Sequence, residues 1–315
     1  MSRYFDNKDS FLEPKVNQYG GHMIMSGVQK QSKRKYINID TRFCDEYMNN
    51  GGTATYMVTL PQRIVEVKSV MICNLELPLS IYNISSTIGN NAFLVDNSMI
   101  TIPDGFYADP SFVVLNNPSY LSIKTAINKG LTNAGITNLK YDISNNHSVF
   151  INTSGHTYSL EFDVNSAGFD KYLYKSRLGW VLGFHGADGT YASKYKVAAN
   201  STQLSNSIVN LNGARYLYLV IDEFSSGNQN SFWAPISNYI INKNIIARIS
   251  LNPAIYPFGS VLPANNFNGY LLSDRRSYNG KVDLQKLYIQ LIDEFGNAVS
   301  LNGGDFSFCM EVEYE

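Results

Sequence analysis

Residues 215–224 read RYLYLVIDEF, and this run indicates the fold class of the chain. It is rich in Tyr, Leu, Val and Ile, and Ser225 is the first residue after it that would break a strand. Such β-branched and aromatic residues favour strands over helices. Outward from this run, alternation of apolar and polar residues predicts further strands at 36–40, 55–60, 63–78, 91–96, 98–103, 139–144, 147–152, 157–164, 245–251, 298–301 and 306–314.

A single clear helix is predicted, over residues 119–135. Apolar residues recur there at helical spacing, Ser119 could cap the start and Gly135 could end it. The Asp96-Asn97 and Asn145-Asn146 pairs lie between strands and predict tight hairpin turns. About a dozen short strands with one helix indicate an all-β sandwich or barrel, and composition leaves jelly-roll and immunoglobulin-like topologies open.

The domain organisation follows from the polar stretches. Residues 1–35 show no hydrophobic period and predict an extended N-terminal arm. Residues 36–315 predict one β-sandwich domain with long loop insertions. The Gly-, Asn- and Pro-containing stretches 187–213, 225–243 and 252–279 predict loops, so an inserted subdomain is expected within about 185–280.

Composition argues against several function classes. Charged residues make up 16% of the 315 residues, below the roughly 25% of ordinary globular domains, and the formal net charge is -1. No global field therefore attracts nucleic acid or anionic membranes. The chain has 35 asparagines and 22 tyrosines, so neutral polar groups must cover much of the surface. We expect no secretion signal and no membrane span, because no apolar stretch has the required length.

No motif of a catalytic or cofactor site appears in the sequence. The four histidines do not fall at metal-ligand spacing, and three separated cysteines indicate neither a zinc site nor a disulfide scaffold. We therefore expect no enzyme, no metal and no cofactor. One catalytic hypothesis remains open: Asp222 and Asp293 each follow a strong strand and could form the acid pair of a glycoside hydrolase if they lay roughly 5–9.5 Å apart.

Six segments in consistent order resemble a family of capsid components from the nucleocytoplasmic large DNA viruses, the giant-virus lineage. They are YINIDTRF (36–43), LPQRIVEVKSVMICNLELP (60–78), ITIPDGFY (100–107), LGWVLGF (178–184), RYLYLVIDEF (215–224) and LYIQLIDEFGNAVSLNGGDFSFCMEVEY (287–314). The family order is a basic arm, a strand pair, an IPxGxY turn before a helix, a Gly-Trp-x-x-Gly-Phe segment and a closing DExG…DFSF signature. The resemblance covers most of the chain from residue 36 onward.

The resemblance implies a jelly-roll structural protein of the virion, assembled in the host cytoplasm. It favours the penton, which forms pentamers at icosahedral vertices, over another minor capsid protein. Partners would then be a homopentamer, the major capsid protein and other minor capsid proteins. The resemblance supplies no catalytic residues. A carbohydrate-binding β-sandwich such as a lectin or fibre-like receptor-binding module is the alternative, with a glycan held on exposed loops by groups such as Trp233 and Tyr239.

Contact residues are expected in the predicted loops and in the arm. Aromatic and Arg side chains dominate protein interfaces, so the subunit contacts predicted are Trp233, Tyr256, Phe258 and Arg275. A basic cluster closes the predicted arm and would tie the protein to the inner shell. It consists of Lys30, Lys33, Arg34 and Lys35.

Overall fold

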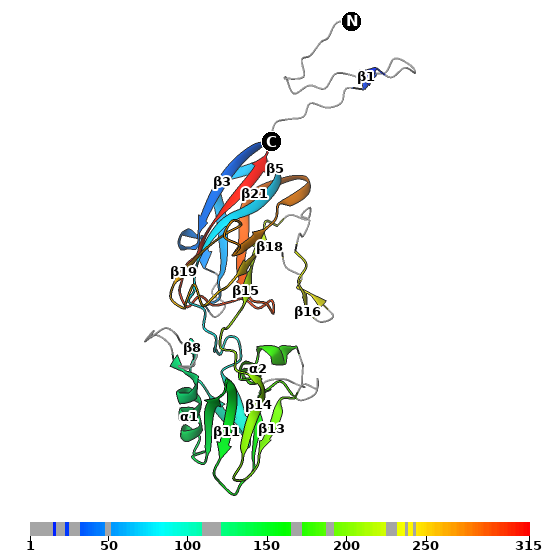
Figure 1. Ribbon diagram of the computed structural model, residues 1–315. Helices are drawn as coiled ribbons and strands as arrows, with labels where there is room; N and C mark the ends of the chain where they lie inside the picture. The colour runs from blue at the N-terminus through cyan, green and yellow to red at the C-terminus, as the bar shows by residue number, and fades with distance from the viewer. Residues whose placement is uncertain are drawn as a thin grey trace.

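The chain folds into an all-β, jelly-roll-like structure, as the sequence predicts (Figure 1). The computed structural model describes residues 15–16, 23–24, 32–47, 52–108, 121–164, 172–186, 192–224, 232–236, 239–241 and 244–315. Buried side chains gather in two large hydrophobic cores. We call residues 32–79 and 214–315 the body, and residues 84–211 the insert. Within the described residues no helix is long and apolar enough to cross a membrane.

The body is built around one very long strand. The strands and the 3-10 helix of the body are β3 (Lys33–Asp40), η1 (Thr41–Phe43), β4 (Glu46–Tyr47), β5 (Thr55–Pro78), β15 (Tyr216–Asp222), β16 (Pro235–Ile236), β17 (Tyr239–Ile240), β18 (Ile245–Ser250), β19 (Val261–Asn265), β20 (Leu271–Ser273), β21 (Arg276–Ile292) and β22 (Ser307–Tyr314). β5 pairs with β21 and then β19 along one edge, and with β4 and then β22 along the other. The principal strand order is β20-β18-β15-β21-β5-β22-β3.

The prediction of two strands separated by Pro61 was wrong, because β5 runs continuously from 55 to 78. Proline lacks the N–H that a ladder position requires, so it is confined to irregular or edge positions. Pro61 falls between the pairs Thr59↔Lys286 and Leu284↔Ile64, where the register of β5 against β21 shifts. The irregular pairing therefore accommodates the proline without ending the strand.

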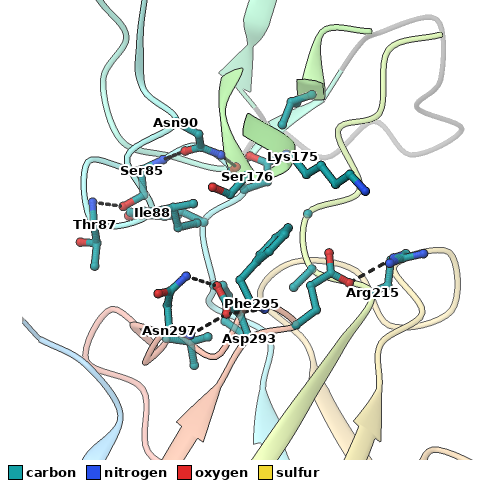
Figure 2. Close-up of a pocket in the computed structure, with 18 of the residues that line it drawn as sticks. Ser85, Thr87, Ile88, Asn90, Lys175, Ser176, Arg215, Asp293, Phe295 and Asn297 are labelled. Atoms are coloured by element: carbon teal, nitrogen blue, oxygen red, sulfur yellow. Dashed lines mark hydrogen bonds and ion pairs between the residues drawn. The ribbon is translucent and has the colours of Figure 1, made fainter. Parts of the chain in front are cut away.

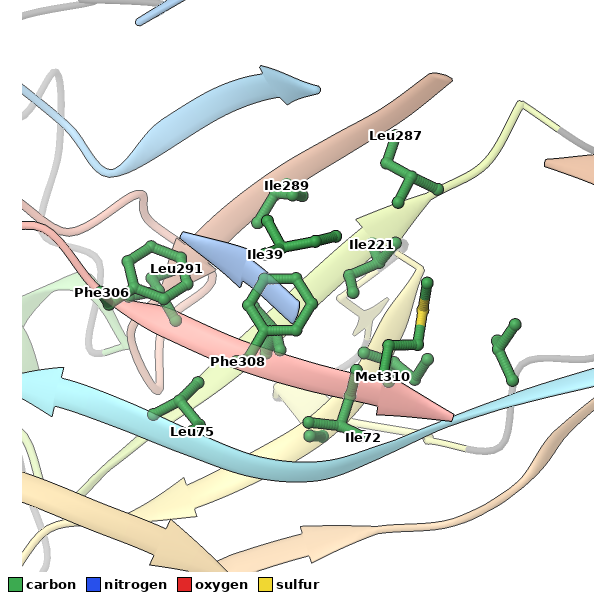
Figure 3. Close-up of a cluster of buried hydrophobic side chains, with 14 of the residues drawn as sticks. Ile39, Ile72, Leu75, Ile221, Leu287, Ile289, Leu291, Phe306, Phe308 and Met310 are labelled. Atoms are coloured by element: carbon green, nitrogen blue, oxygen red, sulfur yellow. The ribbon is translucent and has the colours of Figure 1, made fainter. Parts of the chain in front are cut away.

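Alternate residues of the long strands fill the first core (Figure 3). In β22, Phe308, Met310 and Val312 are buried, whereas Cys309 between them is partly exposed. Ile72 and Leu75 of β5 pack on the same core from the neighbouring strand. In β22 the apolar residues alternate as a strand with one covered face requires, while Glu311 is also buried, and a register shift against β22 separates Ile72 and Leu75 by three residues.

The insert has its own core, two small antiparallel sheets and, among its described residues, the short parallel pair β8-β9. Its elements are β6 (Ala92–Val95), β7 (Ser98–Thr101), β8 (Tyr107–Ala108), β9 (Leu121–Ser122), α1 (Ile123–Asn133), β10 (Leu139–Ser144), β11 (His147–Asn152), β12 (Tyr158–Glu161), η2 (Leu173–Ser176), α2 (Leu178–Val181), β13 (Lys194–Val197) and β14 (Thr202–Ile208). The sheets have the orders β10-β11-β14 and β13-β12-β6-β7. Phe93, Phe150, Phe162 and Phe184 contact one another between them.

The helix is shorter than predicted. α1 begins after Ser122, whose hydroxyl accepts a hydrogen bond from the N–H of Thr125 at 3.3 Å. The predicted cap, Ser119, lies outside the described residues, and Leu121 belongs to β9 and is 45% exposed. Gly135 follows the helix with φ +77°, a left-handed conformation that glycine adopts at little cost. The predicted end of the helix is thus confirmed and its start is corrected.

The Gly-Trp-x-x-Gly-Phe segment packs too tightly for any side chain at its glycines. A Cβ atom on Gly179 would lie 2.6 Å from Phe162, and one on Gly183 would lie 2.1 Å from the carbonyl oxygen of Ser207. Gly183 also has φ +86°. The two glycines therefore allow the short helix α2 to approach the sheets of the insert closely.

The structure corrects the predicted loops at 187–213 and 252–279. The first contains β13 and β14, and the second contains β19, β20 and the start of β21. The second core comprises residues between 84 and 197, whereas Leu217, Ile246 and Leu262 belong to the first core. The insertion defined by core packing therefore begins about 100 residues before the subdomain expected within 185–280.

The predicted arm also differs in its last residues. β1 (Lys15–Val16) and β2 (Met23–Ile24) pair antiparallel within residues 1–35. Residues 33–35 already belong to β3, which pairs with β22 along its whole length. The first strand of the body therefore begins at Lys33, a few residues before the strand predicted at 36–40.

Candidate functional site

A cavity of about 560 Å³ lies between the body and the insert (Figure 2). Its walls come from four parts of the chain that are far apart in sequence: residues 81–90, 172–181, 210–216 and 293–302, with two further residues from β16. The body side carries carboxylates and the insert side carries hydroxyl, amide and aromatic groups. Sequence reasoning did not predict this cavity.

Two acidic residues of the body line the cavity. One oxygen of Asp293 accepts hydrogen bonds from the backbone N–H groups of Phe295 and Asn297, at 2.9 and 2.8 Å. Burial raises the pKa of the Asp293 carboxyl, and these hydrogen bonds oppose that shift. Burial also raises the pKa of Glu294, which accepts a hydrogen bond from Nε of Arg215 at 3.1 Å. Both acids are thus held by their own loop or by a neighbouring cation.

The opposite wall is a set of hydrogen-bonded turns. The side chain of Asn90 accepts from the N–H of Ser85 at 2.8 Å and donates to the carbonyl of Asn83 at 2.7 Å. The Nζ of Lys175 lies 5.7 Å from the ring centroids of both Tyr172 and Trp180, within the range of cation–π attraction. The polar groups of this wall fix its shape, and the ring of Trp180 is itself stacked on His185, with ring centroids 3.7 Å apart.

The structure separates the two carboxylates of the hydrolase hypothesis. β15 and β21 adjoin as antiparallel partners, with Asp222 opposite Tyr288 and Tyr218 opposite Ile292. Asp222 and Asp293 consequently lie at opposite ends of the strand pair, about 13 Å or more apart at the rise of a strand. That separation exceeds what an acid pair of a glycosidase allows. The hypothesis is therefore wrong, because antiparallel neighbours never bring their carboxyl ends together.

The predicted contact residues occupy different environments. Trp233 is 77% exposed on the flank of the body. Tyr256 is partly buried and packs edge-on against Tyr270, with ring centroids 5.3 Å apart. Phe258 stacks on Tyr82 at 6.0 Å and on Phe106 at 4.8 Å. Of these three aromatic residues, Trp233 has the side chain most available to a partner.

Arg275 is engaged within its own chain. Its guanidinium contacts Glu311 at 2.5 Å and Glu313 at 3.2 Å, and it donates to the hydroxyl of Ser69 at 3.0 Å. Arg275 holds the pKa of the Glu311 carboxyl below its ordinary value, with help from the hydroxyl of Tyr36. These contacts join the link between β20 and β21 to β22 and β5.

The basic cluster lies partly on the sheet. Lys30 falls outside the described residues, whereas Lys33, Arg34 and Lys35 are the first residues of β3 and are exposed. Nζ of Lys35 lies 5.9 Å from the ring of Tyr314 in the paired strand. β3 is the last strand in the sheet order, so these cations mark one edge of the body.

An exposed apolar surface lies on β19, β20 and the turn between them. Its exposed members are Val261, Pro263, Phe267 and Leu272; β19 pairs with β5 and β20 with β18, so the two strands do not form a hairpin. Phe267 is fully exposed, and Val261 and Leu272 are more than half exposed. Residues 249–273 include no Asp, Glu, Lys, Arg or His. This uncharged run was visible in the sequence, but its exposure was not.

Comparison with solved structures gives a likeness of fold at low sequence identity. No protein-family model and no curated protein matches this chain. Among solved structures, a crystal structure of the mavirus penton protein is similar over 91% of this chain and 100% of that one, with 9% sequence identity and a TM-score of 0.43.

Proposed function

We propose that this chain is a structural protein of a viral capsid, of the kind found in giant DNA viruses, and that it forms the pentameric penton at the icosahedral vertices. Its partners would be four further copies of itself, the major capsid protein and other minor capsid proteins of a virion assembled in the host cytoplasm. The low charge of the chain suits this role, because the cores of protein interfaces are depleted in charged residues.

The best support for the proposal is that segments resembling the capsid family lie next to one another in the structure. Residues 36–43, 60–78, 215–224 and 287–314 are far apart in sequence, but they include β3, much of β5, β15, part of β21 and β22. These five strands are consecutive in the sheet order β15-β21-β5-β22-β3. Four of the six segments thus form one contiguous block, which supports a shared fold, while segments 100–107 and 178–184 lie in the insert.

A reconstruction of purified virus particles by electron cryo-microscopy tests the proposal. We expect five copies of the body and insert to fit the density at the vertex. The penton assignment fails if the chain fits another position in the shell, which would make it a different minor capsid protein. The capsid proposal itself fails if mass spectrometry finds no copy of the chain in purified particles.

The arm is tested by deleting residues 1–31, which leaves β3 and its pairing with β22 intact. We expect a folded chain that is not incorporated into particles, because the proposed role of the arm is to tie the body to the inner shell. A matched variant with Lys33, Arg34 and Lys35 replaced by Gln separates the contribution of the charges from that of the arm. Normal incorporation of both variants would contradict the role assigned to this region.

The cavity favours one second function, the recognition of a carbohydrate. Trp180 and Tyr172 border a space of about 560 Å³ that also exposes hydroxyl, amide and carboxylate groups. Sugars are bound by aromatic rings together with such polar groups. Binding of the isolated chain to a glycan array, lost in Trp180→Ala, would support this alternative.

A further inference from the structure

A β-bulge lies where β5 and β22 pair in the sheet of the body. Met310 of β22 pairs with Ile72, but its neighbour Cys309 pairs with Asn74. One residue of β22, Cys309, therefore lies opposite two residues of β5, Cys73 and Asn74. That is the count of a β-bulge, in which one strand carries an extra residue while pairing continues on either side. The bulge brings together two cysteines that are far apart in sequence.

The two cysteines lie on the same face of the sheet, the face that points away from the first core. Ile72 and Leu75 flank the bulge in β5; they are 0% and 1% exposed and lie in that core (Figure 3). Between them, Cys73 is partly exposed and Asn74 is exposed, so both point to the opposite face. Cys309 lies between two buried residues of β22 and is partly exposed as well. A reagent in solution can therefore reach both thiols from one side.

The spacing of this pair suits a disulfide bond. Residues opposed across antiparallel strands have Cα atoms about 4.5–5.5 Å apart, and disulfides join Cα atoms about 4.4–6.8 Å apart. Electrostatics indicates the same proximity, because burial raises the pKa of the Cys73 thiol and the negative charge of Cys309 raises it further. The third cysteine, Cys44, follows η1 and packs against the first core from there.

We propose that Cys73 and Cys309 form an intrachain disulfide bond when the chain meets a small-molecule disulfide such as oxidised glutathione. The thiolate of one cysteine attacks a sulfur of oxidised glutathione, which releases one glutathione and leaves a mixed disulfide. The second cysteine then attacks the protein sulfur of this mixed disulfide and releases the second glutathione. The two cysteines lose two electrons and two protons, and one molecule of oxidised glutathione becomes two of reduced glutathione.

The bond would fasten the last strand of the chain to the long strand β5. β22 lies between β5 and β3 in the sheet order, so a cross-link to β5 also secures the strand on which β3 pairs. The chemistry lies within one chain and does not depend on the proposed function. In a capsid, the chain would assemble with reduced thiols in the host cytoplasm, and the bond would form in released particles, because oxidising conditions prevail outside the cell.

The test exposes the reduced full chain to a series of ratios of oxidised to reduced glutathione and then alkylates the remaining thiols. Mass spectrometry should show that two of the three thiols are lost, with the unalkylated chain about 2 Da lighter. Proteolytic digestion should yield a peptide pair that joins Cys73 to Cys309. Cys44→Ser is the matched control and should still lose two thiols. Cys73→Ser and Cys309→Ser, with their folding checked by circular dichroism, should form no internal bond.

Thermal unfolding measures what the bond does to the body. The oxidised chain should have a Tm about 3–7 °C above that of the same sample reduced again with a phosphine, and Cys309→Ser should show no such difference. Persistence of all three thiols at the most oxidising ratio would overturn the proposal. So would glutathione adducts without an internal bond, or bonds formed only between copies or with Cys44. The position of the chain in virus particles is read separately, so failure here leaves the proposed function standing.

Discussion

Replacing Arg276 with Met should strongly destabilise the body, because Arg276 forms a fully buried ion pair. The side chains of Arg276 and Glu223 are 0% and 1% exposed, and Nη1 of Arg276 lies 3.0 Å from the carboxylate. The same guanidinium donates to the carbonyls of Ile221 at 2.8 Å and Asn244 at 2.9 Å. Removing one partner of a buried pair takes the counter-ion away from the other, at a cost of about 3–5 kcal/mol.

The carbonyl of Ile221 also loses its donor, whereas that of Asn244 keeps the backbone N–H of Ile221, so we expect Arg276→Met to lower the free energy of unfolding by at least about 4 kcal/mol. Urea unfolding followed by circular dichroism measures the loss. Hydrogen–deuterium exchange of β15 and β21 should assign it to the body rather than to the insert. In the double variant with Glu223→Leu no buried carboxylate remains, and we expect about 2–3 kcal/mol to be recovered.

Two results would contradict this reasoning. A loss below about 1 kcal/mol in Arg276→Met would mean that water reaches the carboxylate and screens it. An equal loss in the single and double variants would mean that the cost comes from packing and from the carbonyls alone. The conservative variant Arg276→Lys keeps the charge but loses the forked hydrogen bonds, so its stability should lie between the wild type and Arg276→Met.

Three further predictions concern the insert and the outer face of the body. Gly183→Ala should destabilise the insert by about 2–4 kcal/mol in urea unfolding, because its φ is positive and the new Cβ would meet the carbonyl of Ser207; retained stability would show that the turn can relax. Because the pKa of Glu311 is lowered in the folded chain, its ion pair stabilises the fold fully above the ordinary pKa of about 4.3, and this stabilisation is lost as pH falls through the lowered pKa. Arg275→Ala should therefore flatten the dependence of Tm on pH at acidic pH. An unchanged profile would contradict this. Burial lowers the pKa of His185, so the free energy of unfolding should decrease as the pH drops below about 6.5. His185→Phe should remove this decrease. Calorimetry from pH 5 to 8 of both proteins measures it, and the same decrease in the variant would contradict the prediction.

The fold class was predictable because the buried strands are rich in β-branched and aromatic residues that favour strands by themselves. The run 216–222 became β15, with five consecutive buried residues, and the Asp96-Asn97 and Asn145-Asn146 turns adopt the positive φ that such hairpins need. β14 was missed because its sequence, TQLSNSI, is mostly polar and its apolar residues Leu204 and Ile208 face outward. Pairing with β11, rather than local propensity, makes this segment a strand.

The cavity and the exposed surfaces were harder to predict. The cavity joins four chain segments whose proximity depends on how the insert sits on the body. Trp233 was chosen as a contact residue for its type, and its exposure fits that choice without testing it. Phe267 lay within a predicted loop, but only the pairing of β19 with β5 and the turn contacts of Asn265 place it at an exposed tip.

The chain leaves the body and returns to it at a single point. The side chain of Asn83, just after β5, donates hydrogen bonds to the carbonyls of Tyr107 and of Leu211, the latter just before β15, at 2.7 and 2.6 Å. The Asn83 amide therefore connects the start of the insert to its end. The body strands β5 and β15 on either side pair only with other strands of the body. Residues 84–211 could therefore be replaced as a unit during evolution while the strands on either side keep their pairing partners.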